Sequence, residues 1–228
     1  MPRRDAVRLL ITATARSRSV TAENASLHIS LPDGSVIDLR KGATLQYREP
    51  FNIHDRGVEL RGEAFFQVTH DPANPFIINT THAILEDMGT SFLVREGRDS
   101  DEVVVATGKV KFTDRNDHSH SLILLPGRKA ALKENQFTES RVANLNFMSW
   151  KTGVLDFRDE PLTQAVEEIS SFYQVGVSVS PDLREDAAGK ITINARFDHQ
   201  SLEETIEEIR LMTKLTIKRE KDTLVFSR

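Results

Sequence analysis

The segment Arg56-Gly-Val-Glu-Leu-Arg-Gly-Glu-Ala-Phe-Phe-Gln-Val68 alternates apolar and polar side chains along most of its length. A period of two places one set of side chains on a single face, which is the pattern of a half-buried β-strand. Similar runs recur at residues 36–39 and 103–112, and they are separated by turns rich in Gly and Pro. Short strands spaced by roughly ten residues are typical of an all-β sandwich or roll. We therefore predict an all-β domain over residues 28–148, preceded by a basic linker or tail at 1–27.

The apolar pattern changes to a helical period from residue 149 onward. Leu162, Val166 and Ile169 recur at helical spacing, and such a stripe indicates an amphipathic helix. A second stripe of this kind follows at Leu202, Ile206, Ile209 and either Leu211 or Met212. Each predicted helix is flanked by short runs that alternate as strands.

The strand–helix–strand pattern occurs twice, at an offset of 40 residues from Phe157 to Phe197. Phe157-Arg-Asp-Glu-Pro-Leu162 aligns with Phe197-Asp-His-Gln-Ser-Leu202, and Val166-Glu-Glu-Ile169 aligns with Ile206-Glu-Glu-Ile209. Ser201 followed by Glu204 predicts a capping box at the start of the second helix. Two such units can bury their two helices against a single sheet. We predict a small α/β domain over residues 149–228, which makes the fold class α+β with two domains.

The composition limits the classes of function. The 228-residue chain has a formal net charge of -4 and a pI near 6.0, so it lacks the basic balance of a nucleic-acid-binding protein. It contains no cysteine, which excludes disulfides, thiolate metal sites and a cysteine nucleophile. No uncharged run is long enough for a membrane-spanning helix, and Arg8 interrupts the short apolar run near the N-terminus. We therefore expect neither a membrane helix nor a clear signal peptide in this sequence.

Residue types that could support catalysis or metal binding are present but isolated. Ser91 lacks the G-x-S-x-G context of a nucleophile elbow, and His118 and His120 have no two further zinc ligands nearby. The acidic pairs Glu167–Glu168 and Glu207–Glu208 are adjacent on helices, so the side chains of each pair point about 100° apart and we interpret them as solvated. We predict no catalytic, cofactor-binding or metal-binding residue and no enzyme activity.

The aromatic residues indicate packing rather than ligand binding. The sequence has 12 Phe but only 2 Tyr and 1 Trp, whereas glycan and nucleotide platforms favour Trp and Tyr. We assign five strand residues to the core: Phe65, Phe66, Phe76, Phe92 and Phe112. Glu63 lies in the most apolar run, so we expect it to be paired with an Arg or with backbone N–H groups. Trp150 is predicted to pack at the junction of the two domains.

Several motifs, in this order, resemble the FecR-type transmembrane sensors of bacteria, also called anti-sigma factors. The motifs are Leu31-Pro-Asp-Gly-Ser35, the segment 56–68, Gly89-Thr-Ser-Phe92, Leu124-Leu-Pro-Gly127 and Trp150-Lys-x-Gly-x-Leu-x-Phe157. Residues 28–148 are similar to the FecR domain. Residues 149–228 are similar to the short N-terminal domain of secretins and TonB-dependent receptors.

The resemblance implies a periplasmic sensor portion that is anchored to the inner membrane in the family. Such a sensor relays a signal in iron or glycan uptake, by protein–protein binding, from a TonB-dependent outer-membrane receptor to an ECF sigma factor. The implied partner is the signalling domain of that receptor. The sigma factor would be held only by a cytosolic segment that is absent from this sequence. No cofactor and no nucleic acid are implied.

Two hypotheses for the function remain open at this point. In the first, the exposed edge of the terminal strand pair accepts the partner by strand addition, through Leu215, Ile217, Lys218, Leu224 and Phe226. In the second, the chain is a carbohydrate- or ligand-binding β protein, including a hydrolase. The second hypothesis requires a cleft with two carboxylates and an aromatic floor.

Overall fold

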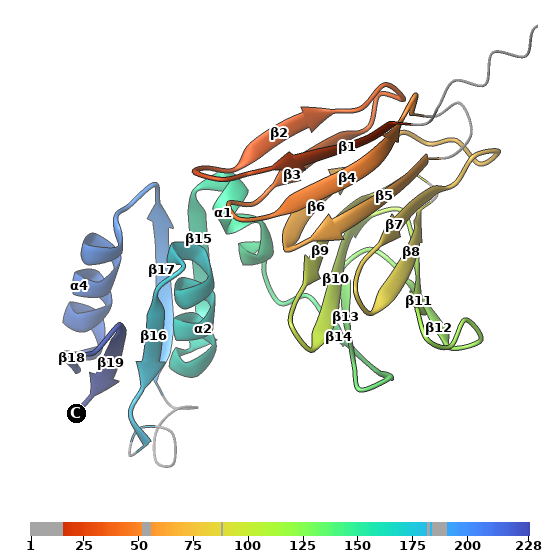
Figure 1. Cartoon of the computed structure of the whole chain (residues 1–228). Helices are drawn as coiled ribbons and strands as arrows, with labels where there is room; N and C mark the ends of the chain where they lie inside the picture. The colour runs from red at the N-terminus through yellow and green to blue at the C-terminus, as the bar shows by residue number, and fades with distance from the viewer. Residues whose placement is uncertain (1–15, 52–55, 88, 182, 184–190) are drawn as a thin grey trace, which may run out of the picture.

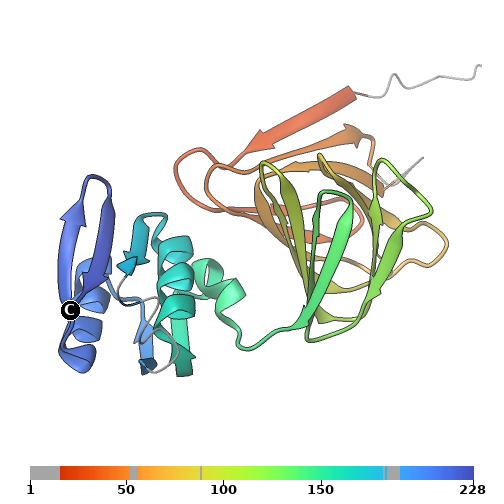
Figure 2. The ribbon, with the colours of Figure 1, turned by 90° about the horizontal axis from the view of Figure 1, so that it is seen from below.

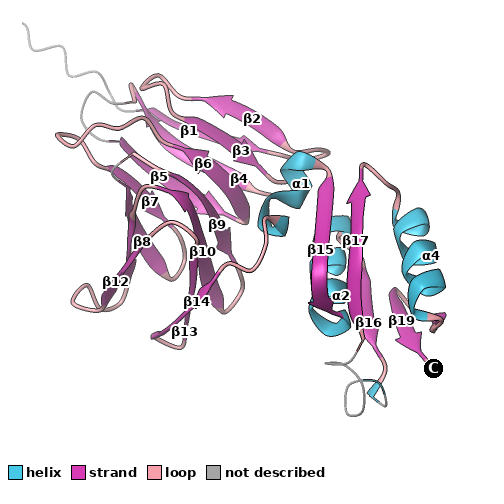
Figure 3. Ribbon diagram, turned by 180° about the vertical axis from the view of Figure 1, so that it is seen from behind, coloured by secondary structure: helices cyan, strands magenta, loops and turns pink. Residues whose placement is uncertain are grey.

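The computed structural model of the chain describes residues 16–51, 56–87, 89–181, 183 and 191–228 (Figure 1). The short apolar run near the N-terminus and most of the predicted basic tail lie outside these residues. Strands dominate the described part, and helices occur only from residue 146 onward (Figure 3). The chain is therefore a β-rich α+β protein.

Two seven-stranded sheets form the larger part of the molecule. The first sheet has the order β1 (Arg16–Thr21), β4 (Thr44–Glu49), β5 (Arg56–Arg61), β7 (Phe76–Asn79), β8 (Ala83–Asp87), β11 (Val110–Asp114) and β12 (Ser121–Leu124). The second has the order β14 (Gln136–Arg141), β13 (Arg128–Lys133), β10 (Ser100–Thr107), β9 (Ser91–Glu96), β6 (Glu63–Gln67), β3 (Val36–Leu39) and β2 (Leu27–Ser30). Both sheets contribute to one hydrophobic core, and Figure 2 shows them enclosing a common interior.

The segment 56–68 links the two sheets, because β5 belongs to the first sheet and β6 to the second. The chain turns between them at Gly62, whose φ is +87°. A Cβ at this position would lie 3.1 Å from the Cα of Ala43, so a glycine is needed both for the backbone angle and for the close approach. The alternation on either side of Gly62 then directs Leu60 and Phe66 into the same core.

One stretch that the sequence analysis assigned to a linker is a strand. β1 (Arg16–Thr21) pairs with β4 along its whole length, and β2 begins at Leu27. The sequence of β1 is polar on both faces, and only Val20 packs against the core. It therefore lacks the period-two pattern that identified the other strands, and its backbone hydrogen bonds to β4 define it instead.

The C-terminal part contains the predicted strand–helix–strand order twice. The elements are η1 (Asn146–Met148), α1 (Ser149–Thr152), β15 (Val154–Pro161), α2 (Leu162–Tyr173), β16 (Gly176–Val179), β17 (Thr192–Asp198), α4 (Leu202–Thr213), β18 (Thr216–Glu220) and β19 (Thr223–Ser227). The capping box is confirmed, since the Ser201 side chain accepts from the Glu204 N–H and the Glu204 carboxylate accepts from the Ser201 N–H. None of the helices in the described ranges is long and apolar enough to cross a bilayer.

The expected single sheet under the two helices is wrong. β15 pairs antiparallel with β17, and a separate three-stranded sheet has the order β16–β19–β18, with β16 parallel to β19. Both sheets and both helices still share one core, to which Leu155, Ile169, Ile209 and Phe226 contribute. Helical periodicity fixes which helix face is buried but not which strands pair beneath it, so the sequence could not determine this division.

A smaller hydrophobic cluster joins the two parts. Phe65, Leu93 and Val104 on the outer face of the second sheet are buried, and the segment 142–150 packs against them through Phe147, Met148 and Trp150. The prediction that Trp150 lies at this junction is confirmed. The five Phe assigned to the core are all buried, and Phe65 is the one that faces the junction rather than the interior of the two sheets.

Candidate functional site

The residues considered for catalysis do not converge in the structure. The backbone N–H of Ser91 donates to Thr107 Oγ1 at the start of β9, and the His120 ring packs edge-on against Phe137 with the ring centres 4.7 Å apart. Among the described residues, no three His, Cys, Asp or Glu side chains are grouped so as to hold a metal ion. These observations direct attention to surfaces that could bind another protein.

The sheet β16–β19–β18 leaves β18 at its edge (Figure 1). β19 supplies antiparallel partners on one side of β18, with Ile217 opposite Phe226 and Lys218 opposite Val225. On its other side, β18 has no strand partner within the described part of the chain. An edge of this kind presents unpaired N–H and C=O groups that can template another strand.

The structure separates the five predicted partner-binding residues into two groups. Leu215 and Phe226 are buried because both pack in the core of the C-terminal part, where Phe226 is completely buried. We therefore correct the prediction that these two side chains contact a partner and assign both to the core. Ile217 and Leu224 are half-buried, and Lys218 is exposed. Of the five, Ile217 and Lys218 lie on the edge strand, where their partner-binding role stays a prediction.

A hollow of about 500 Å³ lies beside the β18 edge, between the strand and the end of α4. Arg210, Leu211, Lys214, Leu215, Thr216 and Ile217 line it, and we call it the β18 groove. The expectation that Leu211 or Met212 completes the buried stripe of α4 is wrong, because these side chains are 62% and 47% exposed. Ile209 is the last fully buried residue of the helix. Two consecutive apolar residues at the end of an amphipathic helix were the sequence signal for this surface, since one helix face cannot bury both.

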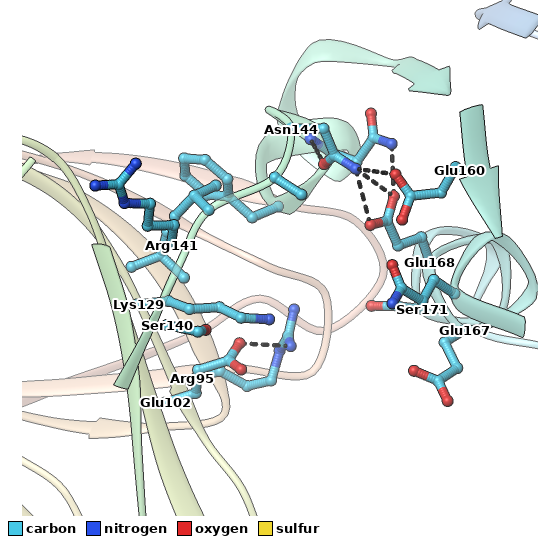
Figure 4. A pocket seen from close by; sticks show the side chains of 16 residues that line it. Arg95, Glu102, Lys129, Ser140, Arg141, Asn144, Glu160, Glu167, Glu168 and Ser171 are labelled. Carbon is cyan, nitrogen blue, oxygen red and sulfur yellow. Dashed lines mark hydrogen bonds and ion pairs between the residues drawn. The ribbon is translucent and has the colours of Figure 1, made fainter. Parts of the chain in front are cut away.

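A second concave region lies between the outer face of the second sheet and α2 (Figure 4). It is a cleft of about 510 Å³. One wall carries the basic residues Arg95, Lys129 and Arg141, and the opposite wall carries the acidic residues Glu160, Glu167 and Glu168. The segment that links the two parts of the molecule forms its floor through Asn144 and Phe147.

Glu168 is not on a solvated helix face, which corrects the sequence interpretation of this residue. Its carboxylate accepts hydrogen bonds from Asn144 Nδ2 at 3.0 Å and from Asn146 Nδ2 at 2.5 Å. Burial raises the pKa of Glu168, the amide donors oppose this shift, and the charge of Glu160 adds to it. Adjacent residue Glu167 remains exposed. The linking segment, which the helical pattern did not include, packs against α2 and partly shields Glu168 from water.

The cleft does not have the arrangement expected for a glycoside hydrolase. Asn144 Nδ2 donates to both Glu160, at 3.3 Å, and Glu168, at 3.0 Å, so the two carboxylates are tied together by an amide rather than placed on either side of a substrate. The lining contains Phe147 but no Trp or Tyr. The geometry therefore gives no support to the hydrolase hypothesis.

Charged side chains of the β-rich part link it to the C-terminal part. Arg40 Nη1 lies 2.8 Å from Glu63 Oε2, and Arg40 Nη2 donates to the carbonyl of Ser171 near the end of α2. Arg95 Nε lies 3.0 Å from the same Glu63 oxygen. The expectation that Glu63 is paired with Arg is confirmed. Lys151 adds a further link, because its Nζ lies 2.5 Å from Asp38 Oδ2.

An open strand edge beside a partly apolar groove is a surface to which another protein can add a strand. The chain belongs to the FecR family: the family model described as FecR protein matches residues 17–111, and the model described as FecR, C-terminal matches residues 154–226. Members of this family are membrane-anchored regulatory sensors.

Solved structures agree with this fold. Two crystal structures, at 1.65 Å and 2.50 Å resolution, of a candidate anti-sigma factor from Parabacteroides distasonis each superpose with a TM-score of 0.69 at 24% sequence identity. They cover 92% and 93% of this chain and 99% of their own chains. Among curated protein sequences, none matches this chain significantly.

Proposed function

We propose that this chain is the periplasmic sensor portion of a FecR-like anti-sigma factor. In this role it binds the signalling domain of a TonB-dependent outer-membrane receptor and relays the signal to an ECF sigma factor, in the regulation of iron or glycan uptake. In the full sensor the portion is anchored to the inner membrane. Family membership supports the regulatory role, and the open edge of β18 is the observation that carries the binding step.

We further propose a division into two domains, which the separate hydrophobic cores support. The buried residues of one core all lie between Ala22 and Leu132, and those of the other all lie between Leu155 and Phe226. The β-rich domain would hold the C-terminal domain at a fixed orientation through the junction around Trp150. The C-terminal domain would then present β18 to the receptor.

Strand addition accounts for the binding step in physical terms. A strand of the receptor's signalling domain pairs with β18 and extends the sheet β16–β19–β18, so that main-chain hydrogen bonds provide affinity. A side chain of that strand enters the β18 groove beside Leu211 and Ile217 and provides selectivity.

Proline substitution in β18 tests this proposal. Along a strand, successive N–H groups point alternately toward the paired strand and away from it, so one of Lys218→Pro and Arg219→Pro removes an outward donor. We expect that variant to bind the purified receptor signalling domain on the order of tenfold more weakly, since it loses a hydrogen bond and gains a steric block. Isothermal titration calorimetry measures the affinity, and circular dichroism checks that the fold is retained.

The matched control places proline in β14, which belongs to the second seven-stranded sheet. β14 is also an edge strand, and Thr138→Pro and Glu139→Pro in it should leave the affinity unchanged. Equal affinity of the wild type and of both folded β18 variants would rule out strand addition at this edge.

A further inference from the structure

We infer that the segment that adds to β18 is an acidic strand in which one apolar side chain is flanked by carboxylates. This inference rests on the proposed function, in which β18 is the docking edge, and it specifies the chemistry of the partner.

The first observation is the concentration of basic residues around the β18 groove. Between residues 210 and 228 the basic residues are Arg210, Lys214, Lys218, Arg219, Lys221 and Arg228, and the acidic ones are Glu220 and Asp222. The chain as a whole has a net charge of -4. The stretch 210–228 is therefore basic within an acidic chain, and exposed basic residues on β18 attract a partner of the opposite charge.

The second observation is that the basic residues nearest the edge are exposed and available. Lys214, Lys218 and Arg219 are exposed, and among the described residues no ion pair engages any of them. Arg210 differs, because it is bound to Glu207. The negative end of a helix dipole explains a basic residue at Lys214, but it does not explain Lys218 and Arg219, which lie on the strand.

Charged edge strands also prevent unwanted pairing, and here that effect selects the partner. If β18 paired with β18 of a second copy, Lys218 and Arg219 of the two copies would approach each other, which is unfavourable. The same residues favour a strand that carries carboxylates. The basic edge therefore disfavours self-association and admits an acidic segment.

The groove accounts for the apolar position of the segment. Leu211, Leu215 and Ile217 supply its apolar lining, and its volume is about 500 Å³. Because strand side chains alternate between faces, Ile217 and Arg219 share one face of β18 and Lys218 points to the other. In a strand that places an apolar residue in the groove, the immediate neighbours of that residue lie on the face of Lys218, and the residues two positions away lie on the face of Arg219.

Hairpin peptides that differ only in charge test the inference. We would use disulfide-closed β-hairpins whose outer strand has an apolar residue flanked by Glu, the same residue flanked by Lys, or Ser in place of the apolar residue between Glu. The chain has no cysteine that could exchange with the disulfide. Fluorescence anisotropy should show that the acidic apolar hairpin binds at least about tenfold more tightly than either of the others. Its affinity should fall between about 0.05 M and 0.5 M salt.

Charge reversal in the protein provides the second arm. We expect the triple variant Lys214→Glu, Lys218→Glu, Arg219→Glu to lose binding of the acidic hairpin and to gain binding of the basic one. The matched control reverses three exposed basic residues elsewhere, Arg48→Glu, Lys109→Glu and Lys133→Glu, which gives the same change in net charge. No preference between the acidic and basic hairpins, or equal effects of the two triple variants, would overturn the inference.

The outcomes for the inference and for the proposed function can be told apart. If the receptor signalling domain binds and a β18 proline variant weakens it, but charge reversal has no effect, the proposed function stands and the acidic-strand inference fails. If the acidic hairpin binds as described but the receptor signalling domain does not, the inference stands and the receptor is not the partner.

Discussion

At the scale of single residues, partly buried charges give the clearest information about this protein. Glu63 was expected to be paired from its apolar sequence context alone, and it is bound by Arg40 and Arg95. Glu168 was expected to be solvated, because a helical pattern assigns each position to a face but does not report what packs on that face from elsewhere in the chain. Asn144 and Asn146, which donate hydrogen bonds to Glu168, belong to the segment that links the two parts of the molecule.

The raised pKa of Glu168 predicts a defined pH dependence of stability. A carboxyl whose folded-state pKa lies above its unfolded-state value binds a proton more tightly in the folded state. Its contribution to stability is therefore full below the unfolded-state pKa and is lost as the pH rises through the folded-state pKa. Glu168→Gln removes this loss, so the variant should gain stability relative to wild type as the pH rises from about 4 to neutrality.

Urea denaturation across this pH range measures the difference. Glu167→Gln is the control, since Glu167 is the exposed neighbour on the same helix, and its difference from wild type should stay nearly constant with pH. A Glu168→Gln difference that is as flat as that of Glu167→Gln would contradict the assigned environment of Glu168.

At the scale of elements, the turn between β5 and β6 decides how the two sheets are connected. The alternation in 56–68 predicts strand structure on both sides of Gly62, and the glycine itself lets the chain leave one sheet and enter the other. Gly42 has nearly the same φ, +88° against +87°, but a Cβ there would meet no atom within 4 Å. Alanine substitutions at the two positions can therefore be compared: at Gly42 only the positive φ destabilises the fold, and at Gly62 the contact with Ala43 adds to it.

We expect Gly42→Ala to lower the free energy of unfolding by about 1 kcal/mol, which is the cost of placing a Cβ at positive φ. Gly62→Ala should lose more, about 2–3 kcal/mol, because the added Cβ also presses on Ala43 in a packed core. Urea denaturation measures both changes, and the additional substitution Ala43→Gly should restore part of the loss in Gly62→Ala. Equal losses for the two glycine variants would show that the contact with Ala43 carries no cost.

At the scale of the whole molecule, Arg40 is the residue that joins the two parts most directly. It is buried against Glu63 in the β-rich part and donates to the Ser171 carbonyl at the end of α2. Removing it leaves Glu63 with one basic partner and leaves carbonyls of α2 without their donor.

We predict that Arg40→Ala lowers the free energy of unfolding by about 3 kcal/mol, as is typical when one partner of a buried pair is removed. The exposed pair Arg18–Glu49 is the comparison, and Arg18→Ala should cost less than about 1 kcal/mol. Small-angle scattering should also show a broader distribution of shapes for Arg40→Ala than for wild type. Similar stabilities of the two Ala variants, with unchanged scattering, would show that Arg40 does not hold the parts together.

The sequence by itself determined the β-rich body, the two amphipathic helices, the capping box at Ser201 and the pairing of Glu63, because each depends on local periodicity or on the cost of burying one charge. Only the tertiary structure decided that the C-terminal strands divide into two sheets, that β18 rather than β19 is the edge, and that Glu168 is covered. These features depend on which distant segments pack together. Side-chain patterns along a strand or helix indicate which face is buried, but they do not indicate which other segment of the chain covers that face.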